Sequence, residues 1–120
     1  MSYDISLCDP VTGEVLHSEA PHDMHGGTYR VGGTTELSLS ITYNYARYFY
    51  RNDVFGDDGI RAIYGLSGAE SIPLIDKAIM ALGDNVSADY WVGAEGNAKR
   101  PLYQLLDMAK MRPDGVWYGD

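Results

Sequence analysis

The chain has 120 residues, enough for one hydrophobic core and too few for two, so we expect one domain spanning residues 1–120. Hydrophobic residues make up 45% of the sequence and charged residues 22%, which argues against a disordered chain. The formal net charge of −8 repels nucleic acid, so direct nucleic-acid binding is not expected.

The compartment is predicted from what the sequence lacks. No apolar run is long enough to cross a membrane, and the first residues do not have the basic and then apolar layout of a secretory signal. Cys8 is the single cysteine, so no disulfide can form within the chain. We therefore expect a cytoplasmic protein that makes no membrane contact.

Strands are predicted in the first half of the chain, where apolar and polar residues alternate. Tyr3, Ile5 and Leu7 give one strand, and the turn sequence at residues 9–13 joins it to a short strand at residues 14–17. Residues 18–33 are predicted to be a long loop with at most a short strand at residues 28–31. In the strand expected at residues 35–43, Leu37, Leu39, Ile41 and Tyr43 face one side, and Ser38, Ser40 and Thr42 face the other.

Helices are predicted in the second half. Asn44 is expected to cap a helix at residues 45–51, and one or two helical turns follow at residues 60–64. Apolar spacing predicts a helix over about 72–82, and a last helix over about 98–111 is expected to be capped by Asn97. The predicted fold class is α+β: a three- or four-stranded antiparallel sheet that starts with an N-terminal hairpin and has one face covered by three to four helices.

Familiar catalytic, cofactor and metal motifs are not expected to operate in this chain. The glycine-rich segment at residues 27–34 has the spacing of a phosphate-binding loop, but Gly33 stands where that loop needs lysine. His17, His22, Asp23 and His25 have poor spacing for a metal site and are predicted to be solvated loop residues. No catalytic residue, metal or cofactor is therefore assigned.

Two segments are candidates for binding. The junction near Asn44 gathers tyrosines with Arg47 and Arg51, which suits a protein interface or stacking on a planar ligand, although Tyr48 and Phe49 are expected in the core. The predicted helix start at residues 95–100 could hold a phosphate or carboxylate through free N–H groups and two cations. The predicted ligand-binding residues are Arg30, Ser40, Thr42, Asn44, Tyr45, Arg47, Asn97, Lys99 and Arg100.

Several segments resemble an uncharacterised group of small bacterial and bacteriophage proteins. They are DPVTGE, GGTYRVGGTTE, ITYNYA, GIRAIYG, GAESIP and EGNAKRPLYQLLDMAKMRPDGVW, which together run over nearly the whole chain. The resemblance implies a setting, the host cytoplasm if the chain is phage-encoded, and a counter-defence role of the kind that small phage proteins often have. It assigns no residue to a function.

Three functions are expected, in descending order. The first is a non-enzymatic accessory protein, forming a homo-oligomer, that sequesters a small anionic or nucleotide-derived ligand. The second is an acidic inhibitor that binds a basic host defence protein surface, in the manner of a nucleic-acid mimic. The third is an enzyme without a recognisable motif.

Overall fold

Three strands form the central antiparallel sheet, in the order β4 (Ser38–Thr42), β1 (Ser2–Cys8) and β5 (Val116–Gly119). A separate two-stranded ribbon consists of β2 (His17–Met24) and β3 (Val31–Glu36). The computed structural model describes residues 2–24, 31–86, 88 and 94–120. The predicted α+β class and antiparallel pairing are confirmed.

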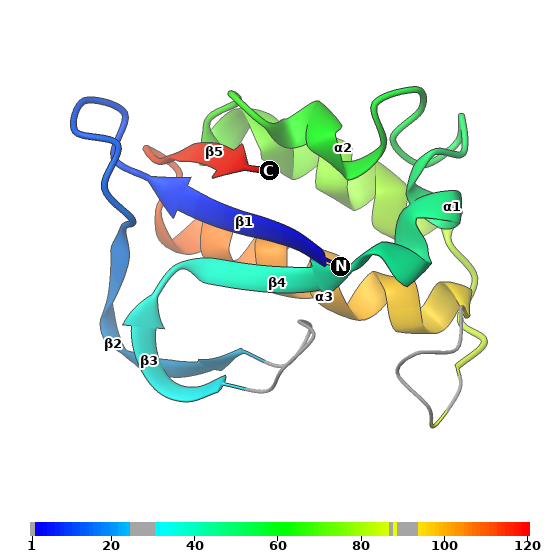
Figure 1. The fold of residues 1–120 in the computed structure, drawn as a ribbon, viewed down its shortest axis with the longest axis horizontal. Coiled ribbons are helices and arrows are strands. Elements are labelled where there is room, and N and C mark those ends of the chain that lie inside the picture. Colours follow the sequence, from blue (N-terminus) through cyan, green and yellow to red (C-terminus); the bar gives the residue numbers. More distant parts are fainter. Residues whose placement is uncertain (1, 25–30, 87, 89–93) are drawn as a thin grey trace.

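The helices lie behind the central sheet in the view of Figure 1. The two long ones are α2 (Gly68–Ala81) and α3 (Glu95–Met111), which pack against each other. Two 3-10 turns, η1 (Tyr43–Tyr45) and η2 (Gly59–Ile63), flank the short α1 (Ala46–Phe49) at the end of β4. Among the described residues, no long helix lies in front of the central sheet in Figure 1.

The alternation predicted in β1 and β4 is confirmed and explains the core. Ile5 and Leu39 are paired across the two strands and are 1% and 5% exposed. Tyr3, Leu7, Leu37 and Ile41 are buried beside them and face the helices. Because side chains alternate along a strand, the serines of the same strands must face away from this core.

The N-terminal hairpin is present but shorter than a full strand pair. The turn at residues 9–13 brings Val15 opposite Cys8, and the Asp9 N–H donates to the Glu14 carbonyl. The chain then leaves the central sheet. Of the strand expected at residues 14–17, the structure keeps the bridge at Val15, and the next strand, β2, begins at His17 and pairs with β3. The expected loop at residues 18–33 is wrong where β2 lies, and residues 28–30 of the expected short strand lie outside the described residues.

Two predicted boundaries are displaced by contacts distant in sequence. The strand expected at residues 35–43 divides at Leu37, whose N–H donates to Leu16 and whose carbonyl accepts from Leu7, so the chain bends there. The last helix starts at Glu95 and its N-cap is Ala94, so the predicted cap at Asn97 is wrong. The N–H of Gly96, in the first turn, donates to the Asn85 carbonyl at 2.8 Å, and this contact takes the place of a side-chain cap.

A capping box fixes the start of α2. Ser67 Oγ accepts from the Glu70 N–H, and the Glu70 carboxylate accepts from the Ser67 N–H, both at 3.0 Å. The helix therefore begins at Gly68, earlier than the apolar spacing predicts.

Replacing Ser67 with Ala is expected to lower the free energy of unfolding by about 1 kcal/mol, because one N–H of the first turn loses its acceptor. Urea unfolding followed by circular dichroism measures the change. The exposed Met80→Ala, near the other end of the same helix, is the control and should change stability by less than about 0.5 kcal/mol. Equal losses in the two variants would contradict the capping role.

Candidate functional site

The outward face of the central sheet carries a row of hydroxyl groups and one carboxylate. Strand pairing sets Asp4 opposite Ser40 and Ser6 opposite Ser38. The Ser6 and Ser38 hydroxyls are 2.8 Å apart, and Ser40 donates to Ser2 at 3.0 Å. These cross-strand bonds hold the hydroxyl groups in place, so the face is polar and ordered by its own contacts.

A hollow of about 210 Å³ opens on this face, between β1, β4 and the end of β3. Its walls carry two carboxylates and four hydroxyl groups, with Ile5 and Leu39 between them. The polar residues of the hollow are Asp4, Ser6, Thr34, Glu36, Ser38 and Ser40.

The two carboxylates give the hollow a negative character. Asp4 and Glu36 are exposed, and no lysine or arginine in the described ranges forms an ion pair with either of them. Ionised carboxylates only accept hydrogen bonds, and each hydroxyl retains a lone pair that can accept another. The arrangement is therefore suited to an ammonium or guanidinium group and disfavours an anion.

Of the predicted ligand residues on or near the sheet, only Ser40 lines the hollow. Thr42 is 2% exposed, and its hydroxyl accepts from the Asn44 N–H at 3.2 Å, so Thr42 is the cap at this junction. The predicted cap at Asn44 is therefore wrong, and Asn44 lies inside η1. Arg30 lies outside the described residues.

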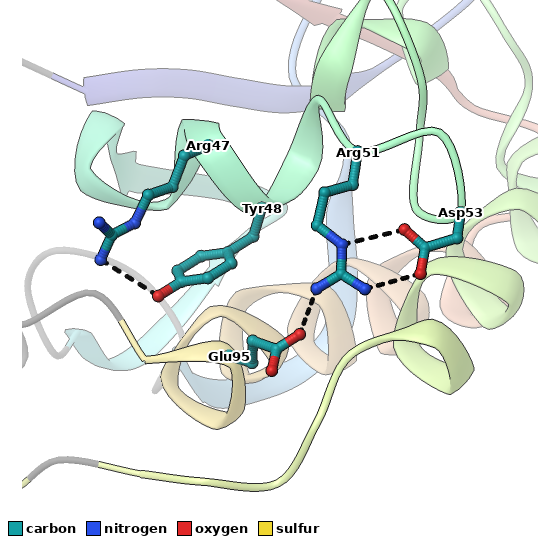
Figure 2. Close-up of polar contacts among 5 residues, drawn as sticks. All are labelled: Arg47, Tyr48, Arg51, Asp53 and Glu95. Atoms are coloured by element: carbon teal, nitrogen blue, oxygen red, sulfur yellow. Dashed lines mark hydrogen bonds and ion pairs between the residues drawn. The ribbon is translucent and has the colours of Figure 1, made fainter.

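The junction tyrosines divide differently from the prediction. Tyr45 is fully buried and packs edge-on against Phe49, so the expectation that Tyr45 offers a binding surface is wrong. Tyr48 is only half-buried, and Arg47 lies over its ring at 5.0 Å and donates to its hydroxyl at 3.1 Å, as Figure 2 shows. This aromatic and guanidinium pair is the part of the predicted surface that the structure retains.

The start of α3 also lacks the predicted anion site. Asn97 is fully buried, and Lys99 forms an ion pair with Asp84 at 2.6 Å. Arg100 is exposed to solvent. Because one cation is already paired and Asn97 is buried, the three residues do not converge on a common surface.

The two predicted segments do meet, through residues outside the predicted set. Arg51 donates to Asp53 through two nitrogens, at 2.9 and 2.6 Å, and its third nitrogen contacts Glu95 in the first turn of α3 (Figure 2). The negative charge of Glu95 also stabilises the N-terminus of α3, which is the positive end of the helix dipole. Arg51 thus connects the loop after α1 to α3. This is a structural role, and the guanidinium charge is balanced by the carboxylates of Asp53 and Glu95.

The Arg51 contact predicts a pH dependence of stability. Hydrogen bonding to Arg51 lowers the pKa of the Asp53 carboxyl. A carboxyl with a lowered folded-state pKa stabilises the fold above its ordinary pKa of about 4, and this stabilisation is lost as the pH falls through the folded-state value. Asp53→Asn is expected to lower the melting temperature at pH 7 and to make no difference near pH 2. Thermal unfolding at both pH values checks this, and the exposed Asp57→Asn is the control. An Asp53→Asn loss that is the same at pH 7 and pH 2 would contradict the prediction.

Metal and membrane sites have no support in the residues that the structure covers. No group of three or more histidine, cysteine or acidic residues is placed to hold a metal there. Within the described residues, no helix is long and apolar enough to span a bilayer. His22 is half-buried, so the prediction that it is a solvated loop residue is wrong, and His25 lies outside the described residues.

Comparison with known proteins gives no relative: no family model, curated protein or solved structure matches the chain. Asp4 and Glu36 were not predicted as ligand residues. Their positions on the same face as the hydroxyl row, in a basic-poor half of the chain, are the signal that could have identified them.

Proposed function

We propose that the protein is a non-enzymatic binding module that takes a cationic side chain from the surface of a basic protein partner into the hollow on its sheet. The observation that carries the proposal is that the carboxylates of Asp4 and Glu36 and four hydroxyl groups line the same hollow. A lysine or arginine head group would exchange its water for these acceptors.

The size of the hollow favours a side chain over a nucleotide. Its volume of about 210 Å³ is below the roughly 300–1,000 Å³ of sites that hold drug-sized ligands. A single lysine or arginine side chain needs less space, and its charged head group would lie among the polar groups of the hollow.

The charge around the hollow favours the same partner. The first 46 residues contain six acidic residues and one basic residue, Arg30. A potential of one sign attracts an oppositely charged partner and speeds its association. An anionic or nucleotide-derived ligand is the second candidate; the observation in its favour is the Arg47 and Tyr48 pair, which is too small a surface to hold it alone.

The resemblance to small phage proteins extends the proposal to a host defence protein as the partner. A nucleic-acid-binding surface of that protein is a suitable target, since an acidic face can occupy a site built for phosphates.

Nona-lysine is the probe that tests the proposal. Isothermal titration at about 50 and 200 mM salt is expected to show binding that weakens by roughly tenfold or more at the higher salt, because counterions screen exposed charges. Nona-glutamate is the matched control and should not bind. Salt-independent binding of nona-lysine, or no binding at low salt, would reject the proposal.

A further inference from the structure

Strand β4 forms an open edge of the central sheet. Within the described residues, the sheet order places β1 on one side of β4 and no strand on the other (Figure 1). The opposite edge of the sheet is closed, because Trp117 in β5 donates to the Leu66 carbonyl at 3.0 Å and accepts from the Gly65 N–H at 2.8 Å. The two edges of the sheet therefore differ, and only the β4 edge can still pair with another strand.

The pairing of β4 with β1 determines which backbone groups point outward at this edge. The Leu7 N–H donates to the Leu37 carbonyl at 2.9 Å, one position beyond the pair of Ser6 and Ser38. Bonded and non-bonded pairs alternate along antiparallel strands, so Ser38 and Ser40 turn their N–H and C=O groups away from β1. The 2.8 Å contact between the Ser6 and Ser38 hydroxyls agrees with this, since side chains are closest in non-bonded pairs.

The outward backbone groups of Ser38 and Ser40 have no hydrogen-bond partner in the described part of the chain. A row of such donors and acceptors is what an extended peptide uses when it adds to a sheet as a further strand. Natural edge strands are commonly protected by charged residues, proline or a bulge. The sequence of β4 is SLSIT and its pairing with β1 has no register shift, so β4 has none of these three devices.

The charges beside this edge distinguish a second copy of the chain from another partner. Ser38 and Ser40 also line the hollow, whose carboxylates belong to Asp4 and Glu36. Pairing of two β4 edges would place two hollows of the same negative sign on one continuous sheet, and their repulsion disfavours such a dimer. A basic segment would instead meet carboxylates of opposite charge.

Strand geometry sets the spacing of the basic residues. In antiparallel addition, the residues opposite Ser38 and Ser40 turn their N–H groups to β4 and their side chains to the face that carries the hollow. Opposite residues have Cβ atoms roughly 4.5–5.5 Å apart, so a lysine or arginine there lies at the margin of the hollow and can extend toward its carboxylates. The residue between them faces the same side as the buried Leu39, which favours an apolar side chain.

We propose that the open edge of β4 binds an extended basic segment of the partner by antiparallel strand addition, with lysine or arginine at every second position. This edge site rests on the proposed function, because the hollow supplies its charge. It adds the form of the partner, an extended segment, and the spacing of the cations. Backbone bonds to β4 contribute affinity, and the hollow selects the basic side chains.

The test uses the peptide acetyl-Lys-Val-Lys-Val-Lys-amide and two N-methylated forms that have the same charge. One form is methylated on the backbone nitrogens of the second and third lysines, which face β4, and the matched control on those of the two valines, which face away. Isothermal titration at about 50 mM salt is expected to show that methylation at the lysines weakens binding by roughly tenfold or more, and methylation at the valines by less than about threefold.

The outcomes separate this proposal from the proposed function. Equal affinities of the two methylated forms would overturn strand addition and leave recognition of the charge intact. Binding of nona-lysine without binding of the unmodified peptide would do the same. If neither nona-lysine nor the unmodified peptide binds, the proposed function fails, and the edge site fails with it.

Amide hydrogen exchange measured by NMR locates the added strand on the protein. In the free protein, the amides of Ser38 and Ser40 should exchange faster than those of Leu39 and Ile41, which point to β1. Saturation with the unmodified peptide is expected to slow exchange at Ser38 and Ser40 by roughly tenfold or more. Slow exchange at both serines in the free protein, or unchanged exchange in the complex, would overturn the proposal.

Discussion

Trp117→Ala is expected to lower the free energy of unfolding by about 3–5 kcal/mol, the usual range when a large buried aromatic side chain is removed. Trp117 is fully buried in β5, and its Nε1 donates to Ser71 Oγ in α2 at 2.7 Å. Ser71 Oγ in turn donates to the Gly68 carbonyl at 2.8 Å. The substitution thus opens a cavity and removes the bond that ties the edge of the sheet to a helix.

Urea unfolding followed by circular dichroism measures this loss, which is a large fraction of the roughly 5–15 kcal/mol typical of a domain. Tyr118→Ala changes the next residue of the same strand, where the side chain is 50% exposed, and should cost only about 0.5 kcal/mol. Trp117→Phe removes the hydrogen bond and a smaller part of the buried ring, with an expected loss of about 1–3 kcal/mol. A Trp117→Ala loss no greater than that of Tyr118→Ala would contradict the packing described.

The second large effect concerns binding. The double variant Asp4→Asn and Glu36→Gln is expected to weaken nona-lysine binding by about tenfold at low salt, because it removes both carboxylates from the hollow and keeps the size of the side chains. The folded state should be preserved, since both side chains are exposed. Titration calorimetry gives the two dissociation constants.

The matched control is Asp57→Asn with Asp58→Asn, which makes the same change in net charge in an exposed loop away from the hollow. It should weaken binding by less than about twofold. Equal effects of the two double variants would show that nona-lysine responds to net charge and that the hollow has no special part.

The sequence predicts those parts of the fold that depend on local periodicity. Leu39 and Ile41 alternate with polar residues, so the buried row of β4 and the polar face opposite could both be predicted. The alternation does not report where a strand bends. The break at Leu37 arises from bonds to Leu7 and Leu16, which are distant in sequence.

Helix starts were less predictable for the same reason. A Cβ atom at Gly96 would lie 2.5 Å from the Asn85 carbonyl oxygen, so the first turn of α3 is fixed by a close backbone contact that only glycine permits. Asn97 is a favourable cap by type, but this contact places it inside the helix and buries it. A single-sequence pattern contains no information about such an approach.

The sequence predicted the hydroxyl groups of the candidate site but not its carboxylates. Hydroxyl residues such as Ser40 were expected on the outward face, whereas the partners that give the face its charge come from β1 and β3. Tyr45 was expected at the surface because Tyr45, Tyr50 and the two arginines cannot all face inward on a short helix, yet it is buried and packs against Phe49. The strand β5 was missed, although the turn residues Pro113, Asp114 and Gly115 before an aromatic pair are a usable signal.

Backbone NMR mapping of the nona-lysine complex tests the central claim most directly. If the hollow takes a cationic side chain, the largest shifts on titration will lie at residues 4–6, 34, 36 and 38–40, which line it. They should disappear in the Asp4→Asn and Glu36→Gln double variant. Shifts centred instead on the acidic loop at residues 57–58, or spread evenly over all exposed carboxylates, would contradict the proposed function.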